Sequence, residues 1–208
     1  MDLQQIVYVI DEEEAPRDSL IFLMQNNGLT SRGFGSARAF LDQLNQDQRG
    51  CIITELRMPA MDGIALVQVL GEIGCIMPVI ATTADATVPL AVQAMKAGVV
   101  DFIEKPFKSE TILEAVRLAL DTARKHDILE TQRAAIERRR ETLTERENQV
   151  FFHAVEGLSN KEIAKDLGIR VRMVGICRAN VMAKMQADSL SGLVRMYLIN
   201  AEAHLQVR

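Results

Sequence analysis

The first 123 residues alternate short apolar segments with helical patterns, and this alternation restricts the fold more than any other feature. The apolar segments are 6–10, 30–34, 51–54, 77–82 and 99–103. Helical patterns follow near 14–27, 36–45, 64–72 and 87–97, and a long one begins near 109. Strands that alternate with helices form a parallel sheet covered on both faces. The sequence therefore predicts an α/β domain with a doubly wound, five-stranded parallel sheet.

From about Thr144 onward the chain has only helical patterns. Thr144 and Glu147 match a capping box, and we expect Asn160 to cap the next short helix. Gly168 marks a tight turn, and the helices around it are expected at 161–167, 171–185 and 189–203. Two short helices joined by a glycine-containing turn are typical of a helix-turn-helix. We expect an α/β domain at 1–123, a helical linker at 124–141 and an all-α domain at 142–208.

The linker contains an apolar repeat. Leu129, Ile136 and Leu143 lie seven residues apart, with Ile128 and Ala135 beside them. A seven-residue repeat is typical of a coiled coil and would favour a homodimer. Charged residues flank it, among them Arg138, Arg139 and Arg140. A solvated connector is therefore an equal alternative.

Charge divides the chain as the patterns do. The whole chain has a net charge of -4, but residues 1–123 carry 9 Lys or Arg and 17 Asp or Glu, a net of -8. Residues 124–141 and 142–208 each carry a net of +2. An acidic front and a mildly basic back indicate different partners for the two halves. The small basic excess does not by itself establish nucleic-acid binding.

Composition also bears on the compartment in which the protein is expected. The apolar segments are all much shorter than the ~18 residues of a membrane span, and the first residues lack the basic start of a signal peptide. The three cysteines are too few and too scattered for a disulfide framework or a zinc site. We expect a reduced cytoplasmic protein that does not enter a membrane.

Polar residues gather where the predicted strands end. Asp11 and Glu12 follow the first strand, Glu55 ends the third, Thr83 follows the fourth and Lys105 follows the fifth. In a doubly wound sheet these ends converge on one crevice. Carboxylate oxygens suit Mg²⁺, and hydroxyl and ammonium groups suit phosphate oxygens. The crevice has the chemistry to hold a divalent cation and a phosphoryl group.

The motifs VYVIDEEEAPRDSL, LRMPAMDG and MKAGVVDFIEKPF resemble the receiver domain of two-component response regulators, most closely the FixJ branch. The resemblance covers residues 5–123. It implies that the position of Glu55, normally Asp, accepts phosphate, and that Asp11 and Glu12 hold Mg²⁺. It further implies that Thr83 and Lys105 contact the phosphoryl group, that Phe102 occupies a rotating aromatic position, and that apolar residues after Thr83 contact a second receiver.

Two departures from that pattern alter the expectation. Glu stands where Asp is usual at positions 55 and 12, and each adds one methylene, ~1.5 Å of reach, to a pocket whose Mg²⁺ tolerates little distortion. Glu55 could reach Lys105 and Thr83 directly and occupy the place of a phosphoryl group. We expect a receiver that is not phosphorylated and is fixed near an active-like state, without a cofactor. A degenerate pocket on a dimer platform and a pocket that still accepts phosphate are the alternatives.

The motifs LTERE, GLSNKEIA and LGI resemble the LuxR/NarL helix-turn-helix family over about 142–205. The resemblance implies that 171–185 is the recognition helix in the DNA major groove. The spacing of Val174, Cys177, Val181 and Met185 predicts its buried face. The candidate base-reading residues on the other face are Arg172, Ile176 and Asn180. The candidate phosphate contacts are Lys161, Lys165, Arg170, Arg178 and Lys184.

These observations together favour a DNA-binding transcription regulator that acts as a dimer on double-stranded DNA without phosphorylation. The alternative is a protein-interaction module that binds a sensor histidine kinase or another response regulator, with auxiliary DNA binding. An enzyme is disfavoured, because the carboxylate cluster matches a non-hydrolytic pattern. The two hypotheses differ in whether the chain selects DNA sites by itself.

Overall fold

The computed structural model describes residues 5–45 and 47–205. Contacts divide the chain into two compact units, residues 1–126 and 127–208. The division falls within α5, one helix that spans Ser109–Arg140. The continuous helix agrees with the absence of Gly and Pro from this stretch. None of the helices formed by the described residues is both long enough and apolar enough to cross a membrane.

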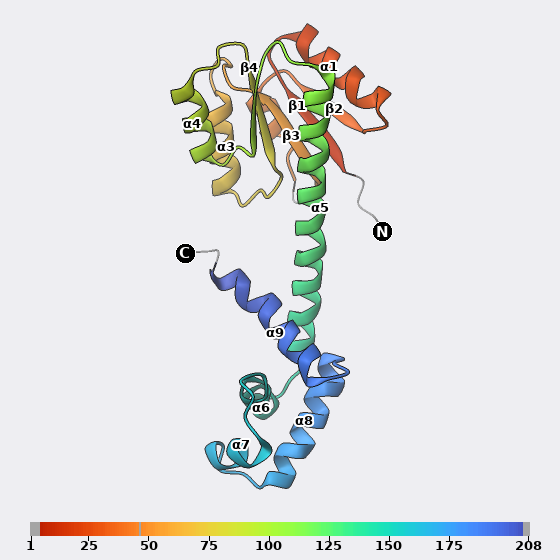
Figure 1. Ribbon diagram of the computed structural model, residues 1–208, viewed down its shortest axis with the longest axis vertical. Coiled ribbons are helices and arrows are strands. Elements are labelled where there is room, and N and C mark those ends of the chain that lie inside the picture. Colours follow the sequence, from red (N-terminus) through yellow and green to blue (C-terminus); the bar gives the residue numbers. More distant parts are fainter. Residues whose placement is uncertain (1–4, 46, 206–208) are drawn as a thin grey trace. The chain divides into compact units, whose positions relative to one another are not determined.

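The first unit contains a parallel sheet of five described strands in the order β2-β1-β3-β4-β5 (Figure 1). The strands are β1 (Ile6–Ile10), β2 (Ser31–Phe34), β3 (Gly50–Glu55), β4 (Val79–Thr83) and β5 (Asp101–Glu104). The helices between them are α1 (Glu14–Asn26), α2 (Ala37–Leu41), α3 (Gly63–Glu72) and α4 (Val88–Ala97). The predicted fold class is therefore confirmed.

Alternate residues of β1 point to opposite faces of the sheet. Tyr8 and Ile10 pack in one core, which includes residues of α2, α3 and α4. Val7 and Val9 pack in the other core, with residues of α1 and α5. This two-residue period places an apolar side chain on each face in turn, which is what a sheet between two helical layers requires. The edge where the strands end is left to the polar residues that follow them.

Several predicted bounds were wrong by a few residues. The fourth strand was expected at 77–82, but β4 begins at Val79, after Pro78, and includes Thr83. The fifth was expected from Val99, but β5 begins at Asp101, because the turn after α4 at Gly98 (φ 110°) comes first. Ser36 does cap α2, as expected, although α2 ends at Leu41. Turn geometry sets these bounds, and apolar patterns do not reveal it.

The second unit is helical, with α6 (Glu145–Val155), α7 (Asn160–Asp166), α8 (Val171–Met185) and α9 (Leu190–Leu205) after the end of α5. The capping box of Thr144 and Glu147 is confirmed. The predicted cap at Asn160 was wrong. Ser159 is the cap, because its hydroxyl accepts from the Glu162 N–H while the Glu162 carboxylate accepts from the Ser159 N–H.

The end of α5 belongs to the core of the second unit. Ile136 is buried with Phe151, Val181 and Met185, and Leu143 packs against this cluster. Two of the three residues in the seven-residue repeat are thus covered by their own chain. Ile136 and Leu143 therefore serve packing within the second unit, and a homodimer formed through the linker stays a prediction.

Candidate functional site: an acidic pocket and a helix-turn-helix

The pocket of the first unit forms where β1, β3 and β5 end. Glu55 is the last residue of β3, Asp11 directly follows β1 and Lys105 directly follows β5. The Lys105 ammonium donates to Asp11 Oδ2 over 2.7 Å and to Glu55 Oε2 over 2.8 Å. The parallel strands bring together residues that are up to 94 positions apart in sequence. A single cation therefore bridges two buried carboxylates.

The other carboxylate oxygens bind backbone N–H groups. Glu55 Oε1 accepts from the N–H of Leu56 over 2.9 Å and of Arg57 over 3.0 Å. Asp11 Oδ1 accepts from the N–H of Glu13 over 3.0 Å. Each of the four carboxylate oxygens of this pair thus already has a donor from the same chain. Such charge-assisted bonds hold both side chains in one orientation.

Lys105 remains charged in this setting. Burial acts to lower the pKa of Lys105, but the hydrogen bonds that its ammonium donates to Asp11 and Glu55 and the charges of those carboxylates outweigh it, so the pKa is raised. The side chain of Lys105 is mostly buried, and those of Asp11 and Glu55 are almost fully buried. The single ammonium compensates half of the negative charge that the two carboxylates bring into the pocket.

The remaining predicted pocket residues differ in how far they are buried. Thr83 is buried at the end of β4, where its hydroxyl accepts from the Asp85 N–H over 3.3 Å. Phe102 is partly buried and packs against the core on the side of α3 and α4. The side chain of Glu12 is exposed. The structure therefore brings Asp11, Glu55 and Lys105 together and leaves Glu12 outside their contacts.

The second unit presents α7 and α8 as a helix-turn-helix around Gly168 (φ 64°). Val174, Cys177, Val181 and Met185 are buried, as their spacing predicts. Arg172, Ile176 and Asn180 lie exposed on the other side of α8. The candidate cations that are exposed beside them are Lys161, Lys165 and Arg170. One side of α8 is thus packed and the other is open to a partner.

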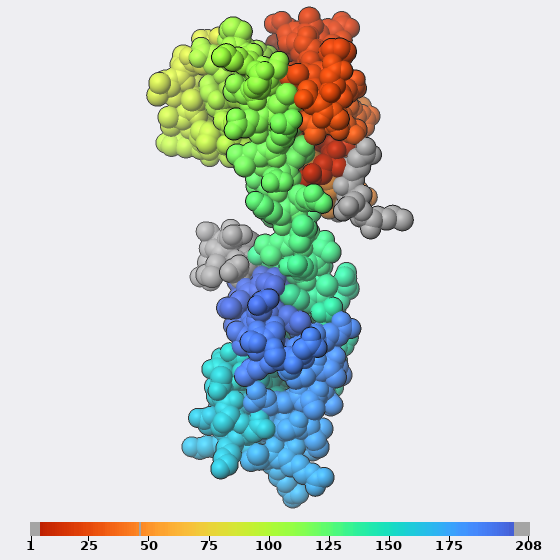
Figure 2. Space-filling model, turned by 45° about the vertical axis from the view of Figure 1, so that its right-hand side comes forward, coloured from red at the N-terminus to blue at the C-terminus, as the bar shows by residue number. Residues whose placement is uncertain are grey.

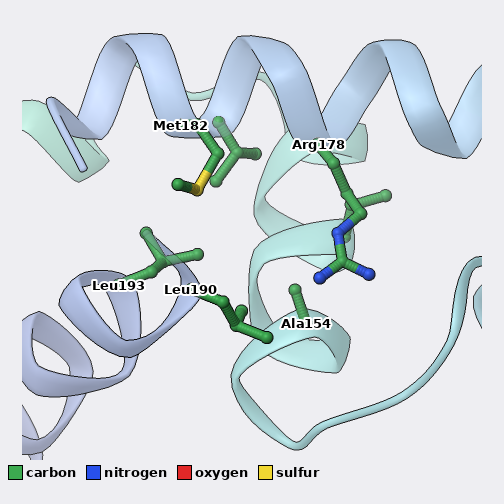
Figure 3. Close-up of a pocket in the computed structure, with 7 residues that line it drawn as sticks. Ala154, Arg178, Met182, Leu190 and Leu193 are labelled. Atoms are coloured by element: carbon green, nitrogen blue, oxygen red, sulfur yellow. The ribbon is translucent and has the colours of Figure 1, made fainter. Parts of the chain in front are cut away.

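Two of the candidate phosphate-binding cations have partners inside the unit. Arg178 donates to Asn160 Oδ1 over 2.9 Å, and its side chain points from α8 toward Ala154 of α6 (Figure 3). It lines an apolar hollow of about 200 Å³ with Val150, Met182, Leu190 and Leu193.

Lys184 donates to Glu147 Oε2 over 2.6 Å and to the Thr142 carbonyl over 3.0 Å. Arg172 is better placed than either for a contact outside the chain.

Known proteins match both units. The model of the response regulator receiver domain matches residues 7–117, and that of bacterial regulatory proteins of the luxR family matches residues 141–197. The transcriptional regulatory protein FixJ of Azorhizobium caulinodans is 47% identical over 93% of this chain and 92% of its own length. FixJ of Rhizobium meliloti is 46% identical over 92% and 94%.

This chain is a DNA-binding response regulator of the FixJ type. The solved structure of the response regulator StyR is 34% identical, covers 93% of this chain and 98% of its own, and has a TM-score of 0.82. Full-length FixJ from B. japonicum is 40% identical, covers 96% and 98%, and has a TM-score of 0.59. The family matches agree with a receiver fold in the first unit and a helix-turn-helix in the second.

One contact in the receiver of this response regulator was not foreseen. Arg57 Nη2 lies 2.6 Å from Asp85 Oδ2, so an ion pair joins the loop after β3 to the loop after β4. Both side chains are more than half exposed, and such pairs contribute little stability. The signal was present in the sequence, because opposite charges follow the ends of two strands that pair in the sheet.

Proposed function

We propose that this response regulator binds double-stranded DNA as a dimer in its unphosphorylated form. The observation that carries the proposal is the Lys105 bridge between Glu55 and Asp11. A carboxylate that accepts a phosphoryl group must offer a free oxygen to phosphorus. Here Glu55 Oε2 accepts from an ammonium, and Oε1 accepts from two backbone N–H groups. Phosphorylation would have to break this arrangement.

The same contacts disfavour Mg²⁺. Asp11 Oδ2 and Glu55 Oε2 face one ammonium, and a divalent cation would have to displace it to reach both oxygens. The exposed Glu12 does not join them. The described residues contain no group of three His, Cys, Asp or Glu side chains placed to hold a metal ion. In this proposal Lys105 supplies the positive charge that a metal would otherwise supply, and Mg²⁺ is not required for DNA binding.

An apolar strip on α4 supports the dimer. Val88, Val92 and Met95 are spaced i, i+4 and i+7, and their exposed fractions are 79%, 48% and 51%. Three large apolar side chains on one helical face are typical of a surface that another protein covers. A second copy of the chain would bury this strip and would present two helix-turn-helix units to two half-sites on one duplex.

Acetyl phosphate treatment followed by intact-mass measurement tests phosphorylation independence. We expect no gain of a phosphoryl mass in the native chain. Glu55→Gln is the control for other sites, and Glu55→Asp tests whether the shorter carboxylate restores acceptance. A phosphoryl gain in the native chain that disappears in Glu55→Gln would refute the proposal.

In vitro selection of DNA sites by the untreated full-length chain tests the function directly, and light scattering measures the dimer. We expect a palindromic site to be enriched, and Val92→Asp to weaken both dimer and site binding. Ile73→Asp is the matched control, because Ile73 is at least as exposed (58%) as Val92 (48%) but lies outside the strip. Selection that requires acetyl phosphate would contradict phosphorylation independence.

The exposed α4 strip also favours a second candidate function. A different response regulator, or a sensor kinase, could cover Val88, Val92 and Met95 in place of a second copy. The chain would then be an interaction module with auxiliary DNA binding. Stable heterodimers with a phosphorylatable relative, and no DNA site selected by this chain alone, would favour this alternative.

A further inference from the structure

The exposed side of α8 is apolar near its beginning. Met173 and Ile176 are the third and sixth residues of α8 and lie on one face, and each side chain is 49% exposed. The core-facing residues Val174 and Cys177 point elsewhere and are buried. Single exposed apolar residues are common, but two that are adjacent on the face of a recognition helix call for a physical reason.

The surroundings of the two side chains are suited to DNA. The sequence of α8 contains no Asp or Glu. Exposed cations lie beside the two side chains, Arg170 at the N-cap of α8 and Arg172 in its first turn. Lys161 and Lys165 of α7 are also exposed. The first turns of α8 lie at the tip of the second unit and are uncovered on the side shown in Figure 2. A polyanion would be attracted to this end of the helix, because cations lie there and α8 has no acidic side chain to repel it.

Gly175 adds to the openness of this surface. A Cβ placed there meets no described atom within 4 Å, so the packing of the unit does not require glycine. Gly175 comes three residues after Arg172, so the absent side chain lowers the helix surface beside Arg172 and Ile176. A groove wall or a base edge could approach the backbone closely at this point.

We propose that Met173 and Ile176 recognise thymine by packing on its methyl group. In the major groove the C5-methyl of thymine is the apolar group that bases present, and residues at the beginning of a recognition helix are the ones that reach base edges. Arg172 supplies a polar contact on the same face, so the site read by α8 combines a hydrogen-bonded base with one or two thymines. This inference deepens the DNA binding proposed above and rests on it.

Deoxyuracil substitution tests the inference, because it removes the methyl and leaves the base pairing unchanged. Sites are first selected by the full-length chain, in parallel with and without acetyl phosphate. Each thymine of the enriched site is then replaced singly by deoxyuracil, and Kd is measured at one salt concentration. At one or two positions per half-site we expect the substitution to weaken binding about fourfold, the effect of losing one buried methyl.

The variants assign each methyl to its side chain. For Met173→Ala or Ile176→Ala, deoxyuracil at one of these positions should no longer change Kd. Deoxyuracil at the other sensitive position should still weaken binding. Ile73→Ala, an exposed apolar residue of the receiver, is the control and should keep every sensitivity. Thermal melting of each variant establishes that it is folded.

The outcomes separate the inference from the proposed function. An enriched site that is insensitive to deoxyuracil, or sensitivity that both variants retain, overturns thymine recognition by these residues. Enrichment only after acetyl phosphate overturns phosphorylation independence and still allows the deoxyuracil measurements. Failure to enrich any site under both conditions, with Met173 and Ile176 instead needed to capture a protein partner, would overturn both.

Discussion

Lys184 of α8 donates a hydrogen bond of 2.6 Å to the carboxylate of Glu147 in α6. The same carboxylate caps α6 through the N–H of Thr144. Glu147 therefore serves as a cap and as an ion-pair partner that ties the recognition helix to α6. Its hydrogen bond with Lys184, followed by that with Thr144, lowers the pKa of Glu147 from 4.5 to about 2.

This lowered pKa predicts acid sensitivity of the second unit. Because the pKa is lower in the folded state, the carboxylate contributes stability above pH 4.5, and that contribution is lost as pH falls from 4.5 toward about 2. Glu147→Gln keeps a side chain that can cap but removes the charge. We expect it to destabilise the unit by about 1–2 kcal/mol at pH 7, since Lys184 is partly exposed, and to have little effect near pH 2. Calorimetry across this range measures the effect, and equal losses at both pH values would contradict it.

Loss of the bridging cation should destabilise the receiver. Lys105→Met leaves Asp11 and Glu55 buried without a counter-charge, and we expect a loss of about 2–4 kcal/mol at pH 7. Because the pKa of Lys105 is raised on folding, this contribution is present below the unfolded pKa near 10.5 and is lost as pH rises through the folded value. Urea denaturation from pH 7 to 11 measures both. Lys108→Met, which alters an exposed lysine, should leave the midpoint unchanged.

Two glycines of the helix-turn-helix should respond oppositely to alanine. Gly175→Ala should stabilise the unit by up to about 1 kcal/mol, because Ala favours a helix interior and its Cβ meets no described atom. Gly168→Ala should destabilise it by about 1 kcal/mol, because Gly168 has φ 64° in the turn before α8. Melting temperatures test the pair. A fall in melting temperature for Gly175→Ala would show that this glycine has a role in the fold.

Arg172 and Arg178 should separate DNA binding from stability. Arg172→Ala should weaken binding to a selected site by about 1–3 kcal/mol and to random DNA by less, because its exposed side chain can read a base. Arg178→Ala should lower the melting temperature. The change removes the hydrogen bond that Arg178 donates to Asn160 and the part of its side chain that lines the apolar hollow beside Ala154. Equal losses of Arg172→Ala on both DNAs would argue against base reading.

Much of the fold could be read from the order of the residues. The alternation of apolar and helical segments predicted the sheet, and the spacing of Val174, Cys177, Val181 and Met185 predicted the buried face of α8. Both patterns are local and periodic, so a single sequence displays them. The cap at Ser159 could also have been found, because Ser159 and Glu162 match the capping box that identified Thr144 and Glu147.

The contacts between distant residues could not be read in this way. The sequence predicts Glu55, Asp11 and Lys105 in one crevice. It does not predict that one ammonium bonds to both carboxylates, because this depends on how the folded sheet aligns the strand ends. Arg178 and Lys184 look like free cations in the sequence, and the packing of α8 on α6 and α7 gives each a partner within the unit. The burial of Ile136 in the core of the second unit likewise depends on contacts with distant residues.

The sequence by itself thus determined the two kinds of domain, the elements that build them and the residue types at the pocket, because periodicity and turn chemistry are properties of neighbouring residues. The tertiary structure alone decided which charges are paired and which remain free. Pairing is set by distances of a few ångströms between side chains on different elements. In this chain those distances place Lys105 in the pocket, pair Arg178 and Lys184 within the second unit, and leave Arg172, Met173 and Ile176 open to a partner.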